Sequence, residues 1–236
     1  ISQPTVSQAI KELEEHYGGL LFERLSKNLY ITEMGEKLLS YARNVVKMFD
    51  DMEEAMLQDA YLKRIRIGAT HTVGDCLLGD VINALREINP NTEIYSYVSN
   101  TKNIEEKLLR SELDIGIVEG SVKSPDLISI PELNDFLVLI CSTKHPFAKR
   151  NMVKLEELKS ESFAMREEGS GTRELFERYM QEKGMPIRIA LEGNSSDAIK
   201  KSVIENGFLA VISVRLVEEE VKNGQIHVIT NEDKGW

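Results

Sequence analysis

The sequence predicts an α/β protein of three successive segments, in which two helical stretches precede a region of alternating strands and helices. Apolar residues recur at helical spacing near the N-terminus, and a heptad-like seam follows them. From residue 64 onward, short apolar runs alternate with amphipathic stretches, which is typical of βαβ units. We therefore expect two α/β subdomains after the helices, each with a largely parallel sheet.

The first segment opens with an amphipathic helix that ends near residue 17, before a pair of glycines. Val6, Ile10 and Leu13 recur at the spacing of one buried helical face. Ser2 precedes this run and is the expected N-cap, because a serine hydroxyl can accept a hydrogen bond from a free N–H of the first turn. The helix therefore has an apolar side and a polar side.

A pair of short strands and a long helix follow. The apolar runs at 20–22 and 29–31 flank a polar tip, which predicts two strands joined by a turn. Thr32 is the expected N-cap of a helix that reaches residue 58. Its apolar residues alternate four and three apart, so the helix needs a partner helix, most simply that of a second copy of the chain. The alternative is a long helix that lies on its own domain. The seam consists of Leu38, Ala42, Val45, Phe49, Met52 and Met56.

The third segment repeats the strand–helix pattern in two halves, joined near residues 142–146. Ligands in open α/β sheets bind beyond the carboxyl ends of the strands, so we expect a ligand cleft between the two subdomains. Strands are expected at 65–69, 93–98, 114–118, 127–130, 136–141, 162–165, 187–191, 208–212 and 226–229, and helices at 77–88, 104–110, 172–183, 195–205 and 214–222.

Charge and cysteine content narrow the function classes. The net charge of −10 argues against a generally basic nucleic-acid binder, and the first 60 residues hold six basic and eleven acidic side chains. Any DNA contact must therefore be local and geometric. No apolar run is long enough to span a membrane and no export signal is visible, so we expect a cytoplasmic protein. Cys76 and Cys141 form no C-x-x-C pair and are expected to be buried thiols, with a redox switch as the alternative.

Catalytic and metal-binding motifs are missing from the sequence. The histidines at 16, 71, 145 and 227 lack metal-ligand spacing, and neither a Walker motif nor G-x-G-x-x-G occurs. Ser170 lies in G-S-G-T rather than in the G-x-S-x-G turn of a hydrolase. We therefore predict no catalytic residue, no metal site and no cofactor.

Five stretches carry a resemblance to a known family: ISQPTVSQAIKELEEHYGGLLFERLSKNLYITEMGEKLL, RIRIGAT, ELDIGIV, REEGSGTR and SSDAIKKSVIENGFLAVIS. In this order they resemble the LysR-type transcriptional regulators over nearly the whole chain. The resemblance implies a winged helix-turn-helix at 1–31, a dimerising linker helix at 32–60, and two effector-binding subdomains of periplasmic-binding-protein type at 61–142 and 143–236. It also implies a further helix before residue 1, and a return to the first subdomain after residue 236.

The resemblance assigns the opening helix to DNA reading. A recognition helix reads bases with its N-terminal residues, and Gln suits the adenine edge while hydroxyls bond phosphate or base. Basic residues of the wing would meet phosphate or the minor groove. The alternative is a polar face that only meets solvent. The predicted DNA-binding residues are Ser2, Gln3, Pro4, Thr5, Ser7, Gln8 and Lys11 in the helix, and Arg24 and Lys27 in the wing, with Gln8 chosen for sequence preference.

Four strand-to-helix turns form the predicted effector site. Hydroxyls, backbone N–H groups and positive helix ends converge at such turns and favour an anion, although each turn singly is explained as an ordinary N-cap. Arg166 adds a charge, but its acidic neighbours Glu167 and Glu168 favour a position facing solvent. The predicted effector is a small carboxylate, sulfate-like or phosphate-bearing metabolite. The site residues are Thr70, His71, Thr72, Asn100, Thr101, Ser170, Gly171, Thr172 and Ser195.

We therefore predict a regulator that binds double-stranded promoter DNA as a homodimer or tetramer, has no membrane partner, and responds to a small anion. Three alternatives remain open: a solute-binding protein without DNA binding, a ligand-sensing dimer, and an enzyme built on the same fold. Deletion of residues 1–31 separates the regulator from the first two, because only the regulator would lose promoter binding while it keeps its ligand.

Overall fold

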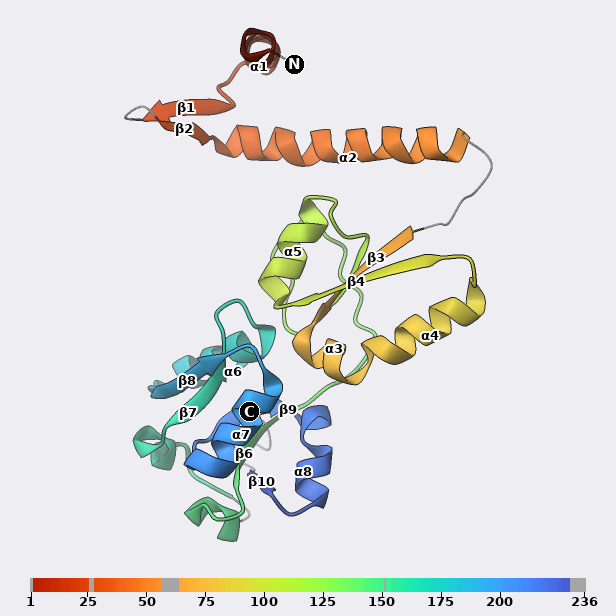
Figure 1. The fold of residues 1–236 in the computed structure, drawn as a ribbon. Helices are drawn as coiled ribbons and strands as arrows, with labels where there is room; N and C mark the ends of the chain where they lie inside the picture. Colours follow the sequence, from red (N-terminus) through yellow and green to blue (C-terminus); the bar gives the residue numbers. More distant parts are fainter. Residues whose placement is uncertain (1, 26–27, 57–63, 151, 230–236) are drawn as a thin grey trace. The chain divides into compact units, whose positions relative to one another are not determined.

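The computed structural model describes residues 2–25, 28–56, 64–150 and 152–229, and it confirms the α/β class (Figure 1). The chain divides into two compact units, of which the first contains residues 1–61 and 109–111 and the second contains the remainder. Within the described ranges, every helix is too short or too polar to cross a lipid bilayer.

The first unit contains two helices and a strand pair. The strands pair antiparallel, with Phe22 opposite Ile31, as the alternation of apolar runs predicts. The first helix ends at Gly18, whose φ of 73° is the left-handed conformation that glycine adopts without strain. The elements are α1 (Gln3–Tyr17), β1 (Phe22–Leu25), β2 (Asn28–Ile31) and α2 (Glu33–Met56).

The apolar face of α1 is not buried, contrary to prediction. Val6 is 49% exposed and Leu13 is 38% exposed, because no described element covers this face. The C-terminal end of α1 is nevertheless fixed to the strand pair. Glu14 Oε1 accepts hydrogen bonds from the backbone N–H groups of Leu21, at 2.7 Å, and Phe22, at 3.3 Å. Leu21, which is only 3% exposed, anchors this junction.

The N-cap predicted for the long helix is confirmed. Thr32 Oγ1 accepts a hydrogen bond from Gly35 N at 3.0 Å and donates one to the Leu20 carbonyl at 2.6 Å. The hydroxyl thus satisfies a free N–H at the start of α2 and ties the helix to the chain before the wing. At 24 residues, α2 is ~36 Å long.

Lobe I, residues 64–118, is a parallel sheet of order β4-β3-β5 with α3 and α4 on one face and α5 on the other (Figure 1). Side chains alternate between the two faces of a strand, so Ile67 and Ala69 of β3 share one face, where they pack against α3 and α4. On the opposite face Gly68 and Gly116 lie side by side in register, and a Cβ at either would be 2.9 Å from the Ile104 side chain. These glycines therefore allow α5 to pack closely. The elements are β3 (Arg64–Thr70), α3 (His71–Cys76), α4 (Leu78–Ile88), β4 (Glu93–Ser99), α5 (Thr101–Leu109) and β5 (Ile115–Ile117).

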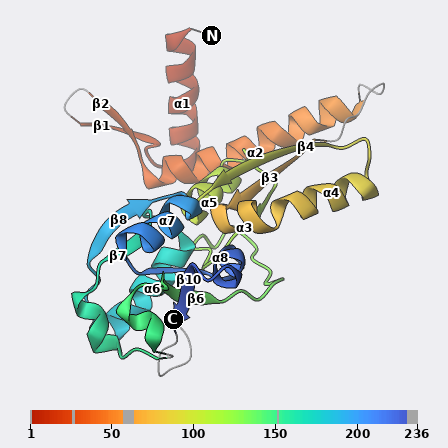
Figure 2. The same cartoon turned by 60° about the horizontal axis from the view of Figure 1, so that its bottom comes forward.

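Lobe II, residues 137–229, is a helix–sheet–helix layer structure. Its strands present Leu139, Phe163 and Val211 to a core that includes α6, and the alternate residues face α7. The strands β7 and β8 run side by side (Figure 2), and an isolated bridge between Phe163 and Leu209 joins them to the order β10-β6-β9. The elements are β6 (Leu137–Ser142), η1 (Pro146–Lys149), η2 (Leu155–Ser160), β7 (Phe163–Arg166), α6 (Gly171–Glu182), β8 (Ile189–Gly193), α7 (Ser196–Asn206), β9 (Ala210–Ser213), η3 (Val214–Leu216), α8 (Glu218–Lys222) and β10 (Ile226–Ile229).

Two predictions for the second unit are wrong. In lobe II, β6 runs antiparallel to both β9 and β10, because it enters from the irregular segment 119–136 and not through a crossover helix. The strand predicted at 127–130 is part of that segment, and Ile128 is 92% exposed. The helix predicted at 77–88 is confirmed as α4, which begins one residue later because Leu77 is its N-cap, although Ile88, predicted on its apolar side, is 73% exposed.

Candidate functional site

The polar face of α1 is open to solvent along its length. Every predicted DNA-contacting residue of this helix is exposed, and no residue of α1 is buried. Ser2 has the extended backbone of an N-cap, but its hydroxyl bonds Thr5 Oγ1 at 2.8 Å and caps no backbone N–H, contrary to prediction. Gln8 Nε2 donates to Glu12 Oε1 at 2.9 Å. The face thus offers hydroxyls and amides on a regular helix.

Positive charge around this face is sparse. Lys11 Nζ lies 3.6 Å from Glu15 on the same helix, which partly neutralises it. Arg24 in β1 is exposed, whereas Lys27 lies outside the described residues. The arrangement suits local recognition through hydrogen bonds more than attraction by a broad basic surface.

The helix α2 carries a wide apolar surface. Of the predicted seam, Val45, Phe49, Met52 and Met56 are 52–78% exposed, and Leu38 is half-buried. Apolar residues outside the seam are also exposed, so the surface is wider than a strict heptad stripe; they are Leu39, Tyr41, Val46 and Met48. Ala42, the remaining seam residue, is exposed as well.

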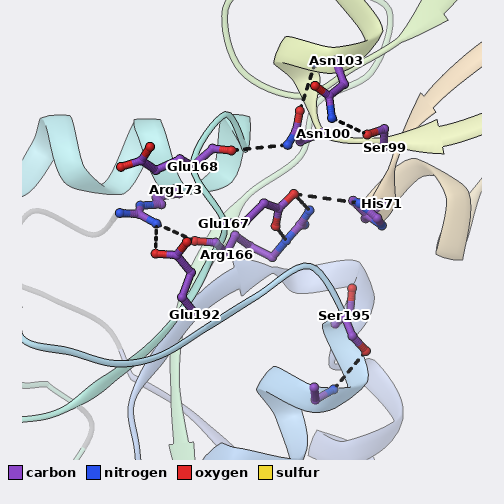
Figure 3. Close-up of polar contacts among 12 residues, drawn as sticks. His71, Ser99, Asn100, Asn103, Arg166, Glu167, Glu168, Arg173, Glu192 and Ser195 are labelled. Atoms are coloured by element: carbon purple, nitrogen blue, oxygen red, sulfur yellow. Dashed lines mark hydrogen bonds and ion pairs between the residues drawn. The ribbon is translucent and has the colours of Figure 1, made fainter.

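In the second unit, two of the predicted turns join lobe I to lobe II (Figure 3). Asn100 Nδ2 donates to the Glu168 carbonyl at 3.3 Å, and the N–H of Lys102 donates to the Gly169 carbonyl at 3.2 Å. Thr101 Oγ1 donates to the carbonyl of Glu119 at 2.9 Å. The start of α5 is therefore held by the turn that precedes α6.

Two predicted turns are also ordinary N-caps, as the alternative reading allowed. Asn100 Oδ1 accepts from the N–H of Asn103 at 3.0 Å, and Ser195 Oγ accepts from the N–H of Ala198 at 3.2 Å (Figure 3). Both side chains satisfy free N–H groups at the start of α5 and α7.

Three predicted threonines behave differently, because their hydroxyls are buried. Thr70 and Thr72 lie near the Glu119 carboxylate and act to lower its pKa without ideal hydrogen-bond geometry, whereas the Thr172 hydroxyl has no partner in the described part of the chain. Thr70, Thr72 and Thr172 are each no more than 3% exposed. Ser170 is equally buried, and its hydroxyl makes no cap contact. An unsatisfied buried hydroxyl is unfavourable by about 1–3 kcal/mol, so such groups mark a place where a ligand or water would bond.

Arg166, which the sequence placed toward solvent, is buried. Its side chain is 3% exposed and forms two hydrogen bonds to Glu167, Nε to Oε2 at 3.0 Å and the terminal nitrogen to Oε1 at 3.2 Å (Figure 3). The other side of the Glu167 carboxylate faces His71 Nε2 across the lobes, at 3.9 Å. A prediction from neighbouring charges was therefore wrong, because the two acidic neighbours of Arg166 point in different directions.

The protonation of these groups follows from burial and from Arg166. Burial, then Arg166, lowers the pKa of His71. Burial alone would raise the pKa of Glu167, but the hydrogen bonds from Arg166 hold it below its ordinary value. Burial raises the pKa of Glu119, although the nearby hydroxyls of Thr72 and Thr70 partly offset this. At neutral pH the cluster thus contains one paired arginine and a neutral histidine.

A pocket of about 810 Å³ opens between α3 of lobe I and α7, η3 and α8 of lobe II. His71 and Ser195 line it, whereas the other predicted effector residues do not. Ser196 Oγ donates to Asp75 Oδ2 at 2.8 Å and closes one side between the lobes. Lys200 is held by Glu220, at 2.7 Å, and by Asp197. The wall carries five carboxylates against two cations, Lys200 and Arg215, so it is acidic; the carboxylates are Asp75, Asp197, Glu218, Glu219 and Glu220.

Sequence reasoning missed several residues of this site. Glu119 follows the strand at 115–117, so the rule that ligands bind beyond strand ends applied to it as well. Asp75 and Glu167 carried no local signal, because each gains its role only from a contact with the other lobe. No three His, Cys, Asp or Glu side chains within the described ranges converge as metal ligands.

Comparisons with known proteins agree with this architecture. The model of the bacterial regulatory helix-turn-helix protein, lysR family, matches residues 1–36, and that of the LysR substrate binding domain matches residues 59–234. The chain is 32% identical over 226 residues to the uncharacterized HTH-type transcriptional regulator YeiE of Escherichia coli, covering 96% of this chain and 76% of YeiE. It is 27% identical over 231 residues to the HTH-type transcriptional regulator CysL of Bacillus subtilis, covering 97% and 77%.

Two solved structures share the fold of this chain. The regulatory domain of CcmR from Synechocystis PCC6803, in complex with 2-PG, is 25% identical with a TM-score of 0.67, covering 73% of this chain and 83% of that domain. Full-length OxyR from Pseudomonas aeruginosa shares the fold with a TM-score of 0.66 at 23% identity, covering 98% and 76%. With both family models matched in order and a relative above 30% identity, the chain belongs to the LysR family of bacterial transcriptional regulators.

Proposed function

We propose that this LysR-family regulator reads promoter DNA with the polar face of α1 and responds to a small anionic metabolite bound between lobes I and II. The observation that carries the anion assignment is the buried Arg166, together with the buried Thr172 hydroxyl at the start of α6, which has no partner in the described part of the chain. A guanidinium and a hydroxyl can both donate hydrogen bonds to a bound oxyanion, and the α6 N-terminus adds a positive helix end.

The DNA-reading face is supported by the family match over residues 1–36 and by the exposure of the predicted side chains. Gln8 is proposed to read a base edge, and Lys27 in the wing to contact phosphate. Replacing Gln8 by Ala should relax base preference by about 1–3 kcal/mol, while Lys27→Ala should weaken all sites alike and flatten the salt dependence. Binding to a specific and a random duplex across salt concentrations measures both effects, and equal losses on the two duplexes for both variants would contradict this division.

The ligand site is supported by CcmR, whose regulatory domain was solved with 2-PG and is similar to most of this chain. Thermal melting with phosphate, sulfate, acetate and 2-PG, against spermidine and an apolar alcohol, tests the anion assignment. Thr72→Val and Thr172→Val should each reduce the anion response, because Val keeps the shape and removes the hydroxyl. Ser96→Ala removes another unpartnered buried hydroxyl, in β4, and is the matched control. A response to spermidine or the alcohol alone would overturn the assignment, and the acidic wall of the pocket makes spermidine the stringent comparison.

The mechanism then follows from linkage between the lobes and the ligand. A ligand favours one lobe arrangement only through its differential affinity for that arrangement. Contacts that join the lobes directly, such as Asn100 to Glu168 and Ser196 to Asp75, are the groups whose geometry a ligand would change. We propose that the apolar surface of α2 pairs two copies of the chain, so that a change in the lobes reaches paired DNA-reading helices.

A further inference from the structure

The Arg166–Glu167 pair has an unusual position for two consecutive residues. β7 ends at Arg166, so Glu167 is the first residue of the turn that faces lobe I (Figure 3). The guanidinium is buried at 3% exposure, while the carboxylate that bonds it is 20% exposed and reaches His71 of the other lobe. In this pair the Arg166 guanidinium is therefore enclosed, and the Glu167 carboxylate is the member that reaches solvent.

The geometry of this pair matches that of a bound oxyanion. Both carboxylate oxygens of Glu167 accept from Arg166, at 3.0 and 3.2 Å, which is the bidentate arrangement that arginine forms with carboxylate and phosphate ligands. Thr70 and Thr72, which flank His71 in sequence, direct their buried hydroxyls at Glu119, and Arg166 acts electrostatically on both His71 and Glu119. Arg166 is thus a buried arginine that acts on groups of both lobes, and a side chain of the protein occupies its donors.

Charge balance prevents a ligand anion from simply joining this pair. Arg166 is one positive charge, and Glu167, whose pKa is lowered, already neutralises it. His71 is held neutral because burial and Arg166 lower its pKa. A second anion would leave an uncompensated negative charge in a region with little water, which is strongly unfavourable. An anion can bind there favourably only when the Glu167 carboxylate moves away into solvent.

Another arginine in lobe II offers a direct comparison. Arg173 is 10% exposed and bonds Glu177 and Glu192, each at 2.7 Å, and also the Arg166 carbonyl at 3.1 Å. These partners all belong to lobe II, and Glu192 is 49% exposed. The Arg173 cluster therefore has a structural explanation within one lobe, whereas the Glu167 carboxylate lies between Arg166 and the opposite lobe.

We propose that Glu167 is an internal competitor of the effector: its carboxylate occupies the donors of Arg166 that an effector anion takes, and binding requires Glu167 to leave. This inference rests on the proposed function and adds a regulatory step to the same site. Because Glu167 also faces His71, its departure removes one contact between the lobes. Occupation of the site and the arrangement of the lobes are then linked through one side chain.

The test is the anion affinity of the whole chain and of three variants, with inorganic phosphate and 2-PG as probes in isothermal titration calorimetry. Glu167→Gln keeps the shape and removes the charge. A competitor that occupies a site nine times in ten lowers the apparent affinity about tenfold, so this variant should bind roughly 10-fold more tightly. Glu192→Gln removes a carboxylate from Arg173 and is the matched control, expected to equal the wild type. Glu167→Asp, a shorter and poorer partner for Arg166, gives an intermediate gain and serves if Glu167→Gln fails to fold.

The outcomes separate this inference from the proposed function. Tighter binding by Glu167→Gln or Glu167→Asp, but not by Glu192→Gln, supports the competitor role of Glu167. The same conclusion holds if the wild type shows no measurable binding and a Glu167 variant binds. If the wild type binds either probe and the Glu167 variants bind no more tightly than Glu192→Gln, the competitor is overturned and the anion site stands. If neither the wild type nor a Glu167 variant binds phosphate or 2-PG, both the competitor and the anion site are overturned.

Discussion

Replacing Gly171 by Ala tests whether the start of α6 is a tight backbone contact rather than an open cradle. A Cβ at this position would lie 2.2 Å from the Glu119 carbonyl oxygen, whereas ordinary contacts begin at 3.4 Å. The two backbones must therefore separate by about 1.2 Å, because a carbonyl oxygen cannot rotate away as a side chain would. Overpacking of this kind costs about 1–3 kcal/mol, and the reduced freedom of the unfolded chain returns about 0.4–1 kcal/mol. The net expectation is a loss of about 1–2 kcal/mol.

Urea unfolding followed by circular dichroism measures this loss, and Gly79→Ala supplies the control. Gly79 lies inside α4, has no heavy atom within 4 Å of its would-be Cβ, and should gain about 0.5–1 kcal/mol as Ala. The two substitutions add the same methyl group, so their difference isolates the contact with Glu119. If Gly171→Ala is as stable as Gly79→Ala, the close approach of the α6 turn to residue 119 is wrong.

Three further outcomes follow from burial and exposure. Burial and Arg166 lower the pKa of His71, so the unfolded chain, in which this pKa is about 6.5, binds the proton more tightly than the folded chain does. The free energy of unfolding should therefore decrease as the pH falls below 6.5 and recover as the pH rises. His71→Gln should remove that slope in urea unfolding at several pH values; an unchanged slope would contradict the burial argument. Burial raises the pKa of Cys141 to about 12, so iodoacetamide should modify it only after denaturation, and rapid labelling of the native chain would refute this. If α2 is the pairing surface, Phe49→Glu should shift the sedimentation equilibrium from dimer toward monomer, whereas Asp50→Ala, at an exposed position of the same helix, should not. A dimer that persists in Phe49→Glu would contradict pairing through α2.

The fold was predictable where the signal is local. Thr32 starts its helix through its own hydroxyl, and the strand at 226–229 has the predicted bounds. Strand direction was not predictable for β6, because pairing depends on partners more than 65 residues away along the chain. The segment 127–130 has the composition of a strand, but no strand of the described chain pairs with it. Periodicity identifies which face a residue occupies, and it does not supply the neighbour that buries that face.

The positions of the candidate site's turns were predictable from the sequence, whereas the surroundings of its charged groups were not, for a physical reason that Arg166 makes clear. A strand end followed by a helix start fixes where a turn lies, so the positions of Thr70, Thr72 and Thr172 at such turns were predictable, while their role in binding an effector stays a prediction. The charge of Arg166 gave the wrong exposure, because acidic neighbours were read as a solvated run. In the structure the Glu167 side chain bonds the guanidinium, whereas Glu168 contacts lobe I through its backbone carbonyl. A carboxylate beside an arginine can therefore shield it from ligand as well as from solvent, and only the contact across the lobes distinguishes the two roles.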